Sequence, residues 1–143
     1  MALLSPSDQA KLRESFVEMT APVRLLFFTQ ALGCGGCLQT RQILDELPGL
    51  SDKITIDEVN FVLEQDKAAT YGIDRVPAIV LLESDDADSR IRFLGTPSGY
   101  EFISLVHAVL LVGGRASNLT NENRKRIAAV DRPVTMQVFT TPT

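Results

Sequence analysis

Two cysteines, Cys34 and Cys37, separated by two glycines, are the feature that most constrains the fold of this chain. They follow an apolar run, residues 23–29, whose composition predicts a buried central strand. They precede residues 38–47, where apolar residues at helical spacing predict a helix. The cysteines are therefore expected in a strand-to-helix connection, with Cys37 about one helical turn after Cys34.

This placement suits dithiol chemistry. Exposed N–H groups at a helix N-terminus favour negative charge, and such sites lower the pKa of a cysteine from about 8.5 to roughly 3.5–7.5. The thiolate of Cys34 is therefore the predicted nucleophile toward a substrate disulfide. Cys37 is the predicted resolving thiol, which attacks the mixed disulfide and releases the product.

A proline at the start of a later apolar strand supplies the second component. Residues 78–83 predict a strand, and Pro77 at its entrance has no N–H to donate to a sheet ladder. A cis bond between Val76 and Pro77 would account for this position, since cis bonds are essentially a feature of proline. Such a turn would face the cysteines and leave the Val76 backbone free to pair with an extended substrate.

Arg75, two residues before Pro77, has two interpretations. It would either point toward Cys34 and favour the thiolate, or form a surface ion pair with Asp74 or another acid. The sequence leaves both open.

The rest of the chain alternates between helical and strand patterns. This order predicts a mixed sheet with helices on both faces. Ser98–Glu101 has the spacing of a capping box, and two glycines after Val112 are expected only to end the helix that the box opens. The remaining expected elements are a helix from Ser5 to about Thr20, a strand at 53–60, a helix at 63–71, a strand at 90–94, a helix at 120–130 and a strand at 134–140.

The cysteine motif alone also allows a zinc site or a structural disulfide. Structural zinc usually needs four Cys or His ligands, and the chain has two cysteines and one histidine, His107, about seventy residues further along. A disulfide between cysteines this close would constrain little of the chain. Redox chemistry is the better interpretation, so neither a metal nor a cofactor is expected.

Charge and hydropathy restrict partners and location. The formal net charge is −4 and no block of basic residues is present, which argues against nucleic acid or an anionic membrane as a partner. The N-terminus lacks the pattern of a signal peptide, and the longest apolar stretch, residues 108–112, is too short to span a bilayer. We therefore expect a soluble cytoplasmic protein, in which a close cysteine pair indicates redox use.

Residues 34–37, 73–77 and 95–102 together resemble the N-terminal unit of the glutaredoxin-like protein disulfide oxidoreductases. Those proteins carry two thioredoxin-fold units, each with its own C-x-x-C. The resemblance implies an α/β, thioredoxin-like fold with a mixed four-stranded sheet flanked by helices, an extra N-terminal helix and a C-terminal helix plus strand. It divides the chain into a thioredoxin-fold unit, 1–115, and the linker helix and first strand of a truncated second unit, 116–143.

Residues 92–114 are also similar to the N-terminal domain of the flavoprotein component of alkyl hydroperoxide reductase. There the first unit lacks its cysteines and only the second unit reacts, so the cysteine pair of this chain moves it toward the disulfide oxidoreductases. Thioredoxin itself has a buried acid six residues before its first cysteine, and Phe28 stands at that position here. Asp57 or Glu58 on the next strand could substitute for that acid.

These observations predict a thiol–disulfide oxidoreductase acting on protein disulfides through Cys34 and Cys37, with Arg75, Val76 and Pro77 at the substrate. One alternative is an electron shuttle between a flavin-dependent, thioredoxin-reductase-like flavoprotein and a peroxiredoxin. Another is a non-catalytic packing module of a two-unit protein. The unpaired strand expected at 134–140 predicts a homodimer formed through that strand.

Overall fold

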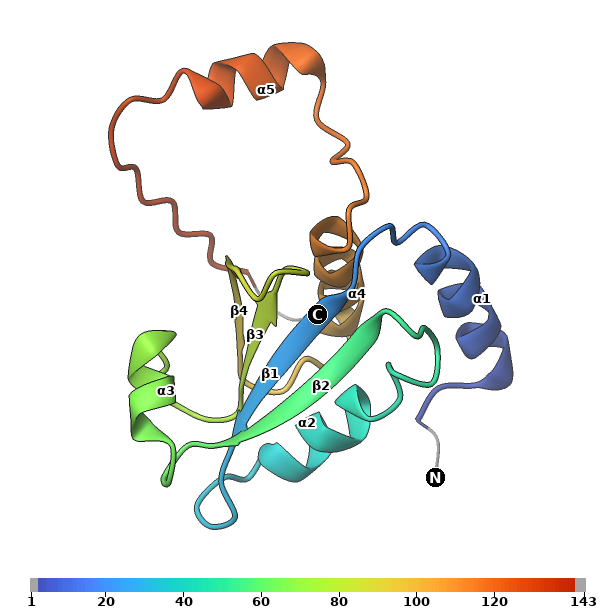
Figure 1. Cartoon of the computed structure of the whole chain (residues 1–143), viewed down its shortest axis with the longest axis vertical. Coiled ribbons are helices and arrows are strands. Elements are labelled where there is room, and N and C mark those ends of the chain that lie inside the picture. Colours follow the sequence, from blue (N-terminus) through green and yellow to red (C-terminus); the bar gives the residue numbers. More distant parts are fainter. Residues whose placement is uncertain (1–2, 141–143) are drawn as a thin grey trace.

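A mixed sheet of four strands organises the chain in the computed structural model, which describes residues 3–140 (Figure 1). The strand order is β2-β1-β3-β4. The central strand β1 (Val23–Thr29) pairs in parallel with β2 (Ile54–Asn60) and antiparallel with β3 (Ala78–Leu82). β3 pairs antiparallel with β4 (Asp88–Leu94). The expected mixed sheet, with a strand at the predicted buried run, is confirmed.

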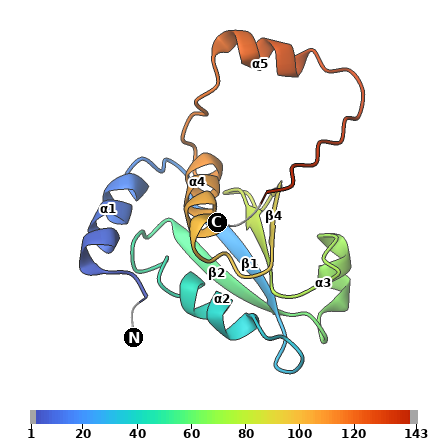
Figure 2. The same cartoon turned by 180° about the vertical axis from the view of Figure 1, so that it is seen from behind.

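Helices cover both faces of this sheet (Figures 1 and 2). The helices of the chain are α1 (Pro6–Phe16), α2 (Cys37–Leu44), α3 (Gln65–Thr70), α4 (Tyr100–Val112) and α5 (Asn121–Ala128). Successive side chains of a strand point to opposite faces, and almost all side chains of β1 are buried. Leu25 and Phe27 pack with α1, α2 and α4, whereas Leu26 and Phe28 pack with α3.

Side-chain caps begin α1 and α5 where the sequence predicted helix starts. The Ser5 hydroxyl accepts a hydrogen bond from the Asp8 N–H at 3.1 Å, and the Thr120 hydroxyl accepts one from the Asn123 N–H at 3.2 Å. α1 ends at Phe16 rather than near Thr20, because the chain tightens into i→i−3 bonds there. Between residues 3 and 140, no helix combines the length and apolar composition that crossing a bilayer requires.

The capping box expected at Ser98–Glu101 is wrong. α4 begins at Tyr100, after Gly99, and no side chain caps it. Gly99 has a φ of 59°, a left-handed conformation that glycine adopts readily, and this turn takes the Ser98 side chain away from the capping position. The first N–H groups of the helix bond to backbone carbonyls instead, Glu101 to Ser98 and Phe102 to Gly99.

The strand expected at 134–140 is also wrong. These residues form no strand, and every residue from 118 to 140 is exposed. α5 stands away from the sheet on extended connections (Figures 1 and 2). A strand needs a neighbour to satisfy its backbone groups, and no strand among residues 3–140 pairs with this segment.

Candidate active site

One edge of the sheet gathers the predicted site from four separate parts of the chain. The parallel register sets Thr29 beside Asn60, so the connections that follow β1 and β2 leave the sheet together. The antiparallel registers set Ala78 opposite both Phe28 and Leu94. The start of β3 and the end of β4 therefore reach the same edge, which brings residues 30–37, 61–64, 76–77 and 95–96 together.

The two cysteines form a disulfide at this edge, with their Cα atoms 5.5 Å apart. Cys37 is the first residue of α2 and is 5% exposed. Cys34 precedes the helix and is half-buried, so it is the more accessible residue of the two. The Cys37 N–H points back to the Cys34 carbonyl at 3.4 Å. The difference in exposure supports Cys34 as the attacking group and Cys37 as the resolving group.

Pro77 lies directly beside the cysteine turn. The Val76–Pro77 bond is cis. A Cβ built on Gly36 would lie 3.4 Å from the Pro77 Cγ and 3.6 Å from its Cδ. The Pro77 carbonyl accepts a hydrogen bond from the Gly95 N–H at 2.9 Å, while the Val76 backbone has no hydrogen-bond partner among the described residues. The cis bond that the sequence predicted is present, and the pairing of Val76 with an extended substrate stays a prediction.

Arg75 follows the second of its two interpretations. Its Nε donates to the Asp74 Oδ1 at 2.7 Å and its Nη2 to Oδ2 at 3.0 Å, in a pair that is about two-thirds exposed. Hydrogen bonding by Arg75 lowers the pKa of the Asp74 carboxyl, and the same bond raises the pKa of the guanidinium. The Arg75 guanidinium is therefore hydrogen-bonded to Asp74 at the surface.

A buried acid beside the disulfide is not found among residues 3–140. Phe28 faces α3, where its ring packs edge-on against Tyr71 at 6.3 Å. Of the two acids considered as substitutes, Glu58 pairs with Arg41 on α2 at 2.5 Å, and Asp57 pairs with Arg24 at 3.3 Å. Both carboxylates are about half exposed. Within the described residues, no group of three or more His, Cys, Asp or Glu side chains is arranged to hold a metal ion.

Thr40 and Thr96 are site residues that sequence reasoning missed. The Thr40 hydroxyl, completely buried, lies 2.9 Å from the Gly36 carbonyl and 3.0 Å from the Thr96 hydroxyl. The Thr96 hydroxyl lies 3.2 Å from the same carbonyl. A polar residue on the inner face of α2, one turn after the cysteines, was the available signal for Thr40. Thr96 lies in the stretch 95–102 that carries the family resemblance, but no pattern there gave it a role.

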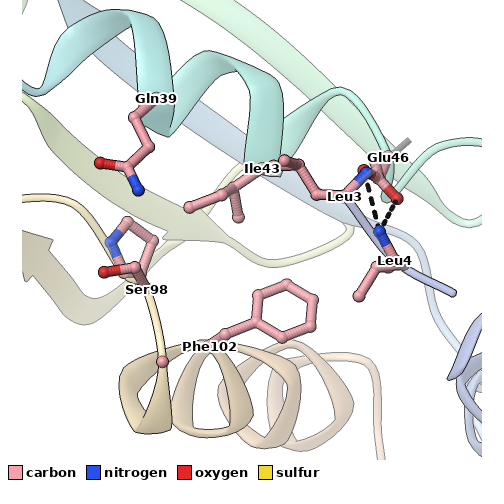
Figure 3. Close-up of a pocket in the computed structure, with 9 residues that line it drawn as sticks. Leu3, Leu4, Gln39, Ile43, Glu46, Ser98 and Phe102 are labelled. Atoms are coloured by element: carbon pink, nitrogen blue, oxygen red, sulfur yellow. Dashed lines mark hydrogen bonds between the residues drawn. The ribbon is translucent and has the colours of Figure 1, made fainter. Parts of the chain in front are cut away.

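A separate cavity of about 240 Å³ lies further along α2 (Figure 3). Gln39 and Ile43 of α2 and Phe102 of α4 line it, and the N-terminal segment crosses its end. The N–H groups of Leu3 and Leu4 donate to the Glu46 carboxylate there. The cysteines do not line this cavity, so it is distinct from the redox pair.

No protein-family model matches the chain. Among curated proteins it is similar to the alkyl hydroperoxide reductase AhpF of Pseudomonas aeruginosa, with 34% identity over 89 residues. That match covers 62% of this chain and 15% of the relative. The matched part of this chain therefore spans less than a sixth of the length of that protein.

Two solved structures are similar over most of the chain. The first is the NTD_N/C domain of AhpF from Enterococcus faecalis, with 33% identity and a TM-score of 0.82, covering 90% of this chain and 62% of that one. The second is a protein disulfide oxidoreductase from Aeropyrum pernix, with 22% identity and a TM-score of 0.75, covering 87% and 54% respectively. Both similarities confirm the expected fold. The second structure, at 22% identity, is evidence for the fold only. The chain is a thioredoxin-fold unit related to the N-terminal domain of the alkyl hydroperoxide reductase AhpF.

Proposed function

We propose that the chain is a thiol–disulfide oxidoreductase that exchanges protein disulfides through Cys34 and Cys37. The observation that carries this proposal is the Cys34–Cys37 disulfide at the start of α2, next to Pro77. The accessible member of the pair precedes the helix and the buried member begins it. That asymmetry suits a reaction in which one sulfur meets the substrate and the other acts from within.

In the reducing direction, the Cys34 thiolate attacks one sulfur of the substrate disulfide. The substrate S–S bond breaks, a mixed disulfide forms, and the departing thiolate takes up a proton. The Cys37 thiolate then attacks the Cys34 sulfur, closes the internal disulfide and releases the second substrate sulfur as a thiol. Two electrons pass from the dithiol to the substrate, and the reverse sequence oxidises a substrate dithiol.

We propose that an extended substrate segment forms backbone hydrogen bonds with Val76, next to Pro77. Among described residues the Val76 N–H and carbonyl have no competing partner. Arg75 is paired with Asp74, so it would contact a substrate only after that exposed pair opens.

Disulfide reduction of insulin driven by dithiothreitol tests this function. The Cys34→Ser variant should lose the activity, and Cys37→Ser should accumulate a mixed disulfide with its substrate. Ser117→Ala, outside the site, serves as the matched control and should keep the activity of the parent chain. A folded parent chain that neither reduces insulin nor exchanges with any disulfide would overturn the proposal.

The similarity to AhpF favours a second candidate, an electron shuttle. In that role the dithiol would accept electrons from a flavin-dependent reductase and pass them to a peroxiredoxin, in the cytoplasm. Slow reduction of insulin together with rapid exchange with one such partner in stopped-flow measurements would select this role. Equal rates with partner and insulin would reject it.

We also propose that residues 116–143 would supply a linker helix and, once paired with strands outside this chain, the first strand of a second unit. The pattern of apolar side chains at 134–140 supports this, because Val134, Met136 and Val138 would share one face of a strand. Where no further unit is present, the same segment is proposed to pair between two copies of the chain.

A further inference from the structure

Three polar groups meet beneath the cysteine turn: the Gly36 carbonyl and the hydroxyls of Thr40 and Thr96. The three contacts measure 2.9 Å, 3.0 Å and 3.2 Å. The Thr40 N–H also donates to the Gly36 carbonyl, at 2.9 Å, as part of the first turn of α2. Thr40 is completely buried and Thr96 is half-buried, so water does not reach the Thr40 hydroxyl freely.

Counting the hydroxyl hydrogens shows which group accepts them. Each hydroxyl has one hydrogen, so two hydrogens serve three short contacts. The two hydrogens cannot both lie between the two hydroxyl oxygens. When both hydrogens serve these contacts, at least one hydroxyl donates to the Gly36 carbonyl, and the other either joins it there or donates to the first hydroxyl. In each of these arrangements the Gly36 carbonyl is held from the side of Thr96 and Thr40.

Anchoring this carbonyl also directs an amide toward Cys34. The Gly36–Cys37 peptide is trans, so its carbonyl and its N–H point in opposite directions. With the carbonyl held under the helix, the Cys37 N–H points back toward Cys34, whose carbonyl lies 3.4 Å away. This bond fixes the first turn of α2 directly after Cys34, and the N-terminal end of a helix favours negative charge on a sulfur that precedes it.

The Thr96 hydroxyl also occupies the space that a side chain at position 36 would need. A Cβ built on Gly36 would lie 2.5 Å from the Thr96 Oγ1, whereas a Cβ on Gly35 would meet nothing within 4 Å. The second glycine of the spacer is therefore a requirement of the hydroxyl contact, and the first is not.

We propose that Thr96 and Thr40 are positioning residues of the redox pair, which hold the Gly36 carbonyl and so set the thiolate character of Cys34. This deepens the proposed function but concerns the reactivity of the thiol itself. It assigns a role to two residues that lie outside both the C-x-x-C motif and the Val76–Pro77 turn.

The charged groups around this edge are already engaged. Arg41 of α2 pairs with Glu58 of β2, and Asp74 pairs with Arg75. Glu64, after β2, accepts from the Asn60 N–H at 2.8 Å. Cys37 is the other titrating group of the pair. A threonine-to-valine change alters none of these charges, so a change in the titration of Cys34 would report the hydroxyl contacts.

The test is the pH dependence of Cys34 alkylation by iodoacetamide in the reduced protein. Thr96→Val and Thr40→Val should each raise the midpoint by about half to one pH unit, the equivalent of one ordinary hydrogen bond. Thr96→Ser keeps the hydroxyl and should keep the parent midpoint. Thr55→Val, at an exposed position of β2, is the matched control and should also leave it unchanged.

Two glycine variants keep the proposal testable if a valine variant fails to fold. Gly36→Ala should displace Thr96 and raise the midpoint, and Gly35→Ala should not. A parent-like midpoint in folded Thr96→Val, or equal shifts in Gly35→Ala and Gly36→Ala, would overturn the proposal. Alkylation needs no protein substrate, so the proposal and the disulfide-exchange function can fail separately.

Discussion

The two glycines between the cysteines have different surroundings. Replacing each with alanine should therefore change the free energy of unfolding by different amounts. Gly36→Ala forces a methyl group against the Thr96 hydroxyl and the Pro77 ring, and overpacking of this kind costs about 1–3 kcal/mol. Gly35→Ala enters open space and should change the free energy of unfolding by no more than about 0.5 kcal/mol. Urea unfolding of the oxidised protein measures both. Similar losses in the two variants would contradict the arrangement at Thr96.

Asp88 makes a pH-dependent contribution to stability at the end of the sheet opposite the cysteines. Two hydrogen bonds from Arg92, at 2.6 Å and 2.8 Å, lower the pKa of Asp88 from 3.8 to about 2. A carboxyl whose pKa is lower in the folded state stabilises the fold above its unfolded value, and this contribution is lost as the pH falls from 3.8 toward 2.

Asp88→Asn should therefore destabilise the protein near neutral pH by up to about 1 kcal/mol, since the pair is partly exposed. The difference from the parent chain should shrink as the pH falls through the window between 3.8 and 2. Chemical unfolding at several pH values measures this. A difference that stays constant down to the lower end of that window would contradict the assigned pair.

At the residue scale, the sequence predicted the groups whose chemistry depends on their immediate neighbours. Cys34, Cys37 and Pro77 are of this kind, because a strand, a helix start and a strand entrance define their positions. Thr96 could not be predicted, since its partner Thr40 is 56 residues away in the chain. Only the fold brings these two hydroxyls together.

At the scale of the element, the end of α4 makes tertiary contacts that its sequence pattern did not predict. Gly113 and Gly114 were expected only to end the helix, but they also pack against the connection between α1 and β1. The Gly113 carbonyl accepts hydrogen bonds from the N–H groups of Thr20 and Ala21, at 2.8 Å and 3.1 Å. A Cβ on Gly113 would lie 2.8 Å from the Met19 Cε and 3.0 Å from the Val109 carbonyl oxygen.

Gly113→Ala should therefore reduce the free energy of unfolding by about 1–3 kcal/mol, although its helical φ of −73° suits alanine. Gly49→Ala, where the nearest atom is at an ordinary 3.6 Å, is the matched control. Guanidinium unfolding of both variants measures the cost. Equal stability of the two variants would show that the helix end does not press on Met19.

Helices and strands were predicted correctly where the apolar residues that form their pattern are buried in the fold. The apolar runs of β1 and β3 predicted strands because they are covered on both faces of the sheet. Residues 134–140 have an alternating apolar pattern but no partner among residues 3–140, so the strand does not form. α4 was predicted from a capping box and from the two glycines after Val112, whereas its start depends on the backbone conformation of Gly99.

For the whole molecule, the distribution of burial predicts that the sheet and its helices are stable without the C-terminal segment. Every residue from 118 to 140 is exposed, and the Arg124 side chain bonds only to nearby carbonyls, those of Ser117 and Leu119. A chain that ends at Arg115 should therefore unfold in the same denaturant transition, within about 0.5 kcal/mol of the parent. A broadened or much earlier transition would show that the segment stabilises the fold.

The same segment should control self-association of the full chain. It exposes four apolar side chains, Val134, Met136, Val138 and Phe139, each at least 66% exposed. An unpaired, apolar segment of this kind is a template for pairing with another copy. The full chain should therefore show concentration-dependent dimers in sedimentation velocity, and the chain that ends at Arg115 should stay monomeric.

The face of the segment that makes this contact can be identified with matched charges. In an extended strand Met136 and Val138 share one face, and Thr135 and Gln137 share the other. Met136→Lys with Val138→Lys should abolish the dimer, because two charges would enter its apolar contact. Thr135→Lys with Gln137→Lys adds the same charge on the opposite face and should leave the dimer in place. A full chain that stays monomeric at every concentration, or equal effects of the two double variants, would show that this segment does not pair between copies through its apolar face.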